Sequence, residues 1–144
     1  WRSIMAAYEN GGHAYHATMP TDAITSFRSV MAETAALGFD TVKAAQQELG
    51  DRVRALLSAR GVVSVAADRY GAPGVVVSYT DDPDMKNGSK FAAAGMQIAG
   101  GVPLMCDEGD DFSTFRLGLF GLDKLTDVDG AVARLESALD RVLG

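Results

Sequence analysis

The sequence predicts an α+β domain in which helices cover one face of a small, mostly antiparallel sheet of three to four strands. Three observations predict this class. Two long segments with apolar residues at helical spacing come first, between residues 21 and 60; short β-branched runs follow, between residues 62 and 120; and a last helical pattern closes the chain. The 144 residues, 47% of them hydrophobic, fit one domain with a core of its own.

The first twenty residues form a connecting segment and a loop, which we expect to be distinct from a domain spanning residues 21–144. Residues 1–9 predict a short helix, and Asn10-Gly11-Gly12 ends it. Residues 13–20 show no period and close at Pro20. The sequence begins with Trp1 rather than methionine, so we expect a fragment of a longer protein.

Two long helices are expected next. The first begins at Thr21-Asp22, whose side chains suit a helix start, and ends at Gly38. The second is capped by Asp40 and ends at Gly61, with an apolar stripe of Val42, Ala45, Leu49, Val53 and Leu56. Gly50 interrupts this stripe at a cost of about 1 kcal/mol relative to alanine, but the stripe continues in phase on both sides.

Short elements occupy the second half of the chain. Strands are predicted at residues 62–65, 75–79, 96–98 and 115–120, with a short helix at 84–94 that Asn87-Gly88 weakens. Thr126 and Asp129 match a capping box at the start of the last helix. That helix has an apolar stripe of Val128, Val132, Leu135, Leu139 and Val142.

Composition narrows the classes of function. The net charge of −6 argues against nucleic-acid binding, because an acidic surface repels phosphate backbones. No apolar run approaches the roughly 18 residues that a membrane span needs. The single cysteine, Cys106, is expected to be a small buried side chain, and we expect a cytoplasmic protein.

The strand at residues 115–120 contains the first candidate binding residue. Alternation places Phe115 and Leu117 toward the core, and Arg116 with Gly118 on the other face. Glycine leaves open space beside the guanidinium, and arginine can hold a carboxylate by two parallel hydrogen bonds. A solvated or ion-paired arginine is the more common arrangement and stays open at this point.

The loop at residues 12–20 is the second candidate. Its histidine, tyrosine and threonine side chains offer donors that could bind a phosphate. His13 and His16 could also bind a metal, but two histidines without a further ligand are a weak signal, and no metal site is predicted. A tail that packs on another surface is the plainer alternative.

Taken together, the two segments resemble class V aminotransferases of fold type I. Tyr15–Pro20, followed by a helix, is similar to the family's Tyr-His-x-Thr-x-Pro stretch, and Phe115–Gly121 is similar to its Arg-Ile-Gly-containing strand. The nearest branch is that of the alanine–glyoxylate and serine–glyoxylate aminotransferases. The position after Tyr-His is often larger and polar in that branch, whereas Ala17 stands here.

This resemblance implies a function for the parent protein. It implies that Tyr15 and Thr18, with His16 as a lesser neighbour, hold the phosphate of pyridoxal 5′-phosphate across the interface of a homodimer. It implies that Arg116 binds the carboxylate of the substrates: a small amino acid such as alanine or serine, and a 2-oxo acid such as glyoxylate.

The resemblance also implies that this chain is the C-terminal small domain. The family's Schiff-base lysine lies in a large domain that would precede Trp1, so the fragment alone is expected to be inactive and to bind no cofactor. The alternative is a stand-alone, non-catalytic α+β module that binds a small carboxylate or a protein partner. A gene that starts near Trp1 would favour this alternative.

Overall fold

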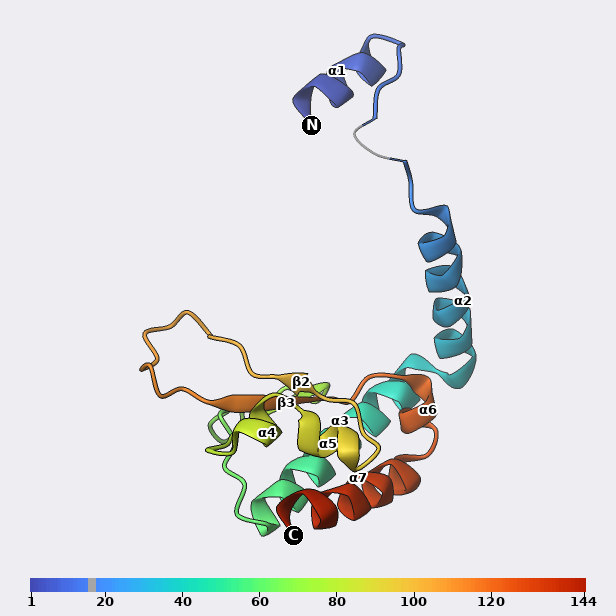
Figure 1. Cartoon of the computed structure of the whole chain (residues 1–144). Helices are drawn as coiled ribbons and strands as arrows, with labels where there is room; N and C mark the ends of the chain where they lie inside the picture. Colours follow the sequence, from blue (N-terminus) through green and yellow to red (C-terminus); the bar gives the residue numbers. More distant parts are fainter. Residues whose placement is uncertain (16–17) are drawn as a thin grey trace. The chain divides into compact units, whose positions relative to one another are not determined.

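The computed structural model describes residues 1–15 and 18–144 (Figure 1). The chain divides into two compact units, Trp1–Ala36 and Leu37–Gly144, and each is described by itself. The predicted division at residue 20 stays a prediction.

The first unit is built from two helices. Helix α1 spans Arg2–Glu9, and most of α2, Thr21–Leu37, follows it. No residue of either helix is buried. The predicted helical spacing in α2 is present, but its apolar side chains are exposed, namely Ile24, Phe27, Val30 and Met31.

The second unit contains a three-stranded antiparallel sheet. Its strands are β1 (Val75–Tyr79), β2 (Ala99–Gly100) and β3 (Thr114–Gly118), in the order β1-β3-β2. The central strand is β3, and Arg116 pairs with Val77 on one side and Ala99 on the other. This arrangement confirms the predicted α+β class.

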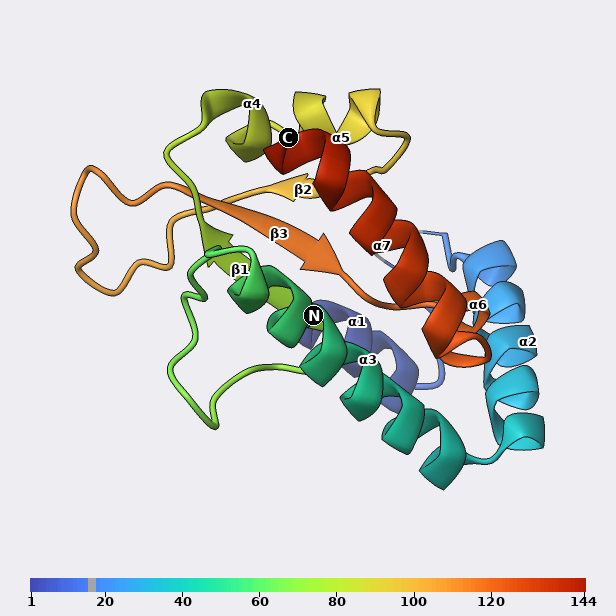
Figure 2. The same cartoon turned by 90° about the horizontal axis from the view of Figure 1, so that it is seen from below.

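Two long helices cover one face of this sheet. Helices α3 (Phe39–Ala59) and α7 (Val128–Leu143) lie side by side over β1 and β3 (Figure 2). Shorter helices follow β1 and β3: α4 (Pro83–Lys86), α5 (Ser89–Ala93) and α6 (Leu122–Leu125). The most deeply buried core side chains join the sheet to these helices, among them Leu49, Phe91, Phe115 and Leu139. The opposite face of the sheet is not covered by α3 or α7.

Several predicted elements differ in extent. Residues 62–65 form no strand, and only a bridge between Ser64 and Ser78 pairs them with β1. The strand expected at 96–98 is found at Ala99–Gly100, and β3 ends at Gly118. The helix expected at 84–94 is divided at Gly88, whose φ of 84° cannot continue an α-helix.

Two predicted helix caps are wrong. Helix α3 begins after Gly38, whose φ is 89°, and Asp40 lies inside its first turn. Helix α7 is capped by Asp127, whose Oδ1 accepts a hydrogen bond from the Gly130 N–H at 2.9 Å. The Thr126 hydroxyl instead donates backwards to the Leu122 carbonyl at 2.8 Å, because α6 ends there.

The backbone at Pro73, in the loop that leads into β1, explains why a glycine, Gly50, lies in the middle of α3. A Cβ at this position would lie 2.8 Å from the Pro73 carbonyl oxygen and 2.9 Å from its Cα. The neighbouring Gln46 side chain donates to the same carbonyl at 3.0 Å. Glycine is therefore needed for helix and loop to pack closely.

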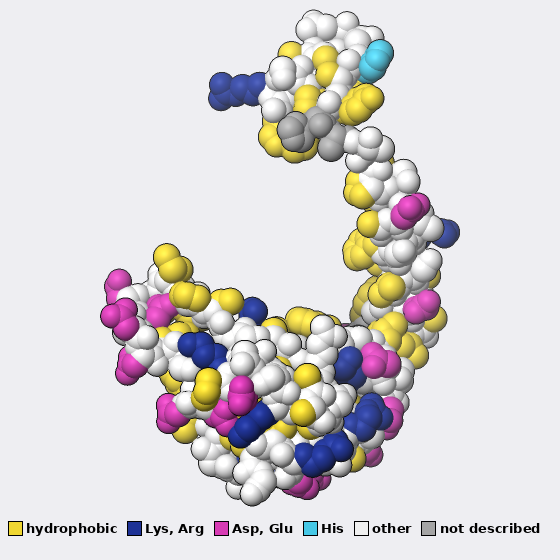
Figure 3. All heavy atoms as spheres, viewed as in Figure 1, with side chains coloured by type: hydrophobic (Ala, Val, Ile, Leu, Met, Phe, Trp, Pro, Cys, Tyr) yellow, Lys and Arg dark blue, Asp and Glu magenta, His cyan; other side chains and the backbone are white. Residues whose placement is uncertain are grey.

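The long loop between β2 and β3 is acidic and exposed, and Figure 3 shows carboxylate side chains gathered there. Cys106 lies in this loop and is exposed, so the prediction of a buried cysteine is wrong. The loop is held by Glu108, whose carboxylate accepts hydrogen bonds from the backbone N–H groups of Leu104, Met105 and Cys106.

In the described part of the chain, no helix has the length and apolar character that crossing a membrane requires.

Candidate functional site

Arg116 lies on the central strand, on the face that α3 and α7 leave uncovered. Its neighbours Phe115 and Leu117 are buried against the helices, whereas Arg116 is half-buried and Gly118 is exposed. The predicted alternation along β3 is therefore confirmed. Sequence alone could not show that β3 is the central strand, because pairing depends on distant segments.

The guanidinium of Arg116 is held at one end only. Its Nε donates a hydrogen bond to the Gly100 carbonyl at 2.9 Å. Across residues 1–15 and 18–144, neither terminal nitrogen has a hydrogen-bond partner, and no carboxylate forms an ion pair with this side chain. The ion-paired alternative is thus not found in the described residues, and the two terminal nitrogens can donate hydrogen bonds to the two oxygens of a carboxylate.

Gly118 leaves space on the same face. A Cβ added there would meet no heavy atom within 4 Å. Gly118 pairs with Val75, and Val77 lies opposite Arg116, so half-buried apolar side chains border the guanidinium. Apolar neighbours lower the local dielectric and strengthen a charged hydrogen bond.

The predicted phosphate-binding residues belong to the first unit. Tyr15 is 73% exposed, and Thr18 is also exposed. No hydrogen bond to either hydroxyl is found within the described residues. His16 and Ala17 lie outside the described residues. His13 is described, and no group of three or more His, Cys, Asp or Glu side chains in the same part of the chain could hold a metal ion.

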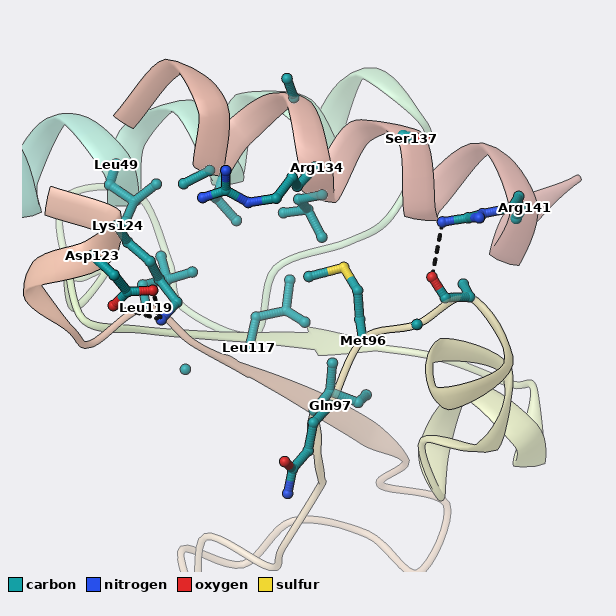
Figure 4. A pocket seen from close by; sticks show the side chains of 18 residues that line it. Leu49, Met96, Gln97, Leu117, Leu119, Asp123, Lys124, Arg134, Ser137 and Arg141 are labelled. Atoms are coloured by element: carbon teal, nitrogen blue, oxygen red, sulfur yellow. Dashed lines mark hydrogen bonds and ion pairs between the residues drawn. The ribbon is translucent and has the colours of Figure 1, made fainter. Parts of the chain in front are cut away.

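A cavity of about 660 Å³ lies between α7 and β3, and it contains none of the predicted site residues (Figure 4). Its walls are largely apolar, with Leu49, Met96, Leu117 and Leu119 among the lining side chains. Lys124, Arg134 and Arg141 stand at its margin.

Each of these three cationic side chains already forms a hydrogen bond or an ion pair within the fold. Arg141 Nη2 donates to the Ala94 carbonyl at 2.8 Å, and Lys124 Nζ donates to the Phe120 carbonyl at 2.8 Å. Arg134 forms a long ion pair of 3.5 Å with Asp127. The sequence did not predict that these cations border a cavity. The seven-residue interval from Arg134 to Arg141 does place both side chains on one face of a helix.

Comparison with known proteins identifies the class of fold. No protein-family model and no curated protein matches the chain. Among solved structures, the chain is similar to an aspartate aminotransferase of subgroup IV from Thermus thermophilus, with a TM-score of 0.64 and 19% identity. The match covers 96% of this chain and 38% of that chain, so the chain spans well under half of that enzyme's length. The shared feature is the fold, which is that of part of an aminotransferase.

Proposed function

We propose that the chain is the C-terminal small domain of a class V, pyridoxal 5′-phosphate-dependent aminotransferase of the alanine–glyoxylate or serine–glyoxylate type. The parent protein, a cytoplasmic homodimer, transfers an amino group from a small amino acid such as alanine or serine to a 2-oxo acid such as glyoxylate. The fold likeness and the motifs around Tyr15 and Arg116 support this proposal.

One observation carries the proposal: the free end of the Arg116 guanidinium beside the space at Gly118. Both substrates of such an enzyme carry a carboxylate next to the reacting carbon. The bond from Nε to the Gly100 carbonyl orients the guanidinium, and its two terminal nitrogens then bind the two carboxylate oxygens. Arg116 thereby positions either substrate without taking part in proton transfer.

The hydroxyls of Tyr15 and Thr18 fit one part of the cofactor. Both are exposed donors that can bind oxygens of a phosphate, and His16 would be a lesser neighbour. When bound, pyridoxal 5′-phosphate supplies an electron sink for the carbon bearing the amino group. In this proposal the Schiff-base lysine belongs to another domain of the parent, so the 144-residue chain alone binds no cofactor and is inactive.

The full-length protein that contains this chain provides the test. Replacing the guanidinium by an amide (Arg116→Gln) removes charge-assisted hydrogen bonds worth about 1.5–3 kcal/mol, so kcat/KM should fall roughly 10- to 150-fold for both substrates. Visible absorbance of the bound cofactor should not change.

The matched control is Arg134→Gln on α7, which should leave kcat/KM within about twofold. A full-length protein without cofactor absorbance or amino-group transfer would contradict the proposed function. A kcat/KM that survives Arg116→Gln would contradict the role of Arg116 alone.

A further inference from the structure

The apolar cavity between α7 and β3 lies apart from the proposed substrate site. Leu117 and Leu119 form part of its wall, and both are buried on the side of the sheet that faces the helices (Figure 4). Arg116 points to the other face of β3 and does not line the cavity. A ligand in this cavity would therefore not occupy the space beside the Arg116 guanidinium.

The cavity has the size and the accessible apolar surface of a small-molecule site. Its volume of about 660 Å³ falls within the range of roughly 300–1,000 Å³ that is typical of such sites. Met96, Ile98 and Ala131 line it and are only half-buried, so part of their apolar surface is open to a ligand. In the described part of the chain, no aromatic ring lines the cavity. The aliphatic walls suit an alkyl chain.

The charged residues at the margin of this cavity are mostly cationic. Lys124, Arg134 and Arg141 line it together with a single acid, Asp123, among the residues that the structure describes. The whole chain has the opposite balance, with 19 acidic and 13 basic residues. This margin therefore attracts an anion, although the net charge of the chain repels one.

Arg141 is the cation at this margin whose charge is not balanced by an acid. Lys124 lies 3.4 Å from a carboxylate oxygen of Asp123. Arg134 lies 3.5 Å from a carboxylate oxygen of Asp127. In the described part of the chain, no carboxylate forms an ion pair with Arg141. Arg141 is therefore the group that an anionic ligand would meet without competition.

The backbone fixes the place of the Arg141 guanidinium. Its Nη2 donates to the Ala94 carbonyl at 2.8 Å, which holds the side chain across one end of the cavity (Figure 4). Arg141 is exposed, and no second hydrogen bond from its guanidinium is found among the described residues. Its remaining N–H groups can donate to a carboxylate that approaches from solvent.

We propose that this cavity binds a medium-chain fatty carboxylate, with the carboxylate on Arg141 and the alkyl chain over Met96 and Leu117. The seven residues from Arg134 to Arg141 span about 10 Å of α7 at 1.5 Å per residue, which leaves room for an extended chain. Burial of the alkyl chain supplies the affinity, and Arg141 sets its direction. This site does not depend on the proposed function.

The 144-residue chain itself allows the test. Labelled with ¹³C at its methionine methyl groups, it is titrated with octanoate, hexanoate, octyltrimethylammonium or acetate. Octanoate should shift the Met96 methyl resonance saturably, and hexanoate should bind roughly 3- to 15-fold more weakly because it buries two fewer methylene groups. Octyltrimethylammonium should bind at least about tenfold more weakly than octanoate, and acetate should leave Met96 unchanged. The exposed Met31 on α2 reports non-specific binding and should not shift.

Arg141→Gln should weaken octanoate binding roughly 5- to 30-fold, between the effects of an exposed ion pair and of a charged hydrogen bond. The matched control is Arg134→Gln on the same helix, because that guanidinium already lies beside Asp127. It should change the affinity less than about twofold. Arg116→Gln should also leave octanoate binding unchanged, because Arg116 lies on the other face of the sheet.

Ala131→Leu tests the apolar part of the site without changing a charge. The larger side chain occupies part of the cavity, so octanoate should bind at least about fivefold more weakly. This variant keeps the test valid if Arg141→Gln fails to fold. Octyltrimethylammonium that binds as tightly as octanoate, or octanoate that shifts Met31 as much as Met96, would overturn the proposal. So would an affinity that Ala131→Leu leaves unchanged. None of these outcomes bears on amino-group transfer.

Discussion

Gly50 shows at the scale of one residue how tertiary packing overrides helix propensity. Gly50→Ala gains about 1 kcal/mol of helix propensity, but its Cβ would press on the Pro73 backbone. Overpacking of this kind costs about 1–3 kcal/mol, so we expect the free energy of unfolding to fall. Urea denaturation measures the change.

The matched control for Gly50→Ala is Gly118→Ala. The added methyl group enters open space on an exposed strand position, so the free energy of unfolding should stay constant or rise by up to about 1 kcal/mol. A Gly50→Ala protein as stable as the control would show that the loop at Pro73 moves away easily.

Glu108 gives the β2–β3 loop a dependence on pH. Backbone hydrogen bonds, first from Cys106 and also from Met105 and Leu104, lower the pKa of Glu108 from 4.5 to about 2. A depressed pKa in the folded state means that the contribution to loop order is present above pH 4.5 and is lost as the pH falls through about 2. The carboxyl ¹³C shift of Glu108 should titrate near 2.

Glu108→Gln provides the comparison for this titration. The amide accepts fewer hydrogen bonds than a carboxylate, so the N–H groups of Leu104 and Met105 should exchange with solvent faster at neutral pH. The Cys106 thiol should also become more acidic, because a hydrogen bond to the Glu108 carboxylate raises its pKa. Unchanged exchange rates would show that other contacts order the loop.

Residue-level prediction from sequence succeeded where one local rule sufficed. The orientation of Arg116 follows from the two-residue period of a strand, and neighbouring buried residues Phe115 and Leu117 fix its phase. Cys106 failed because its burial depends on whether the loop packs, which its own sequence does not encode.

The start of helix α7 illustrates competition between two caps at the scale of an element. Thr126 and Asp127 are adjacent possible caps, and Thr126 is the C-cap of α6, a helix that the sequence did not predict. Asp127→Ala removes the hydrogen bond to Gly130 and should lower the free energy of unfolding by about 1 kcal/mol. Urea denaturation of the Asp127→Ala variant and the unsubstituted protein measures the difference in the free energy of unfolding.

Thr126→Ala is the control at this helix start. Its hydroxyl bonds back into α6 rather than forward into α7, so its loss should cost less than the loss of Asp127. If Thr126→Ala lowered the free energy of unfolding more than Asp127→Ala, the result would favour the capping box that the sequence predicted.

Long elements were predicted well and short ones less well. The stripes of α3 and α7 have a clear helical period, and β1 is a distinct β-branched run; the observed bounds are within one or two residues of the predictions. Strand β2 has only two residues, so no period could reveal it. Its place beside β3 is set by pairing with Arg116 and Phe115 rather than by its own composition.

At the scale of the whole molecule, stability should be concentrated in the second unit. Every core residue buried in the described part of the chain lies between Leu49 and Val142, whereas α1 and α2 bury none. The segment Leu37–Gly144 alone should therefore unfold cooperatively, with nearly the same urea m-value as the full chain and a free energy within about 1 kcal/mol. A loss of cooperativity would show that residues 1–36 contribute to the core.

The fold class was predictable for the whole molecule because the order of long helices, short strands and a final helix admits few layered arrangements. The strand order β1-β3-β2 was not, because it depends on pairing over long sequence separations. The roles proposed for Tyr15, Thr18 and Arg116 still rest on motifs and chemistry, since a shared fold does not determine a reaction.

The central position of β3 has a thermodynamic consequence for Arg116. Its backbone is anchored on both flanks, and its Nε is tethered, so capture of a ligand freezes only the remaining side-chain torsions. The entropy lost there stays below the roughly 2 kcal/mol of a fully free arginine. A preorganised cation of this kind should therefore bind a ligand more tightly than a freely moving surface arginine would, because less entropy is lost on binding.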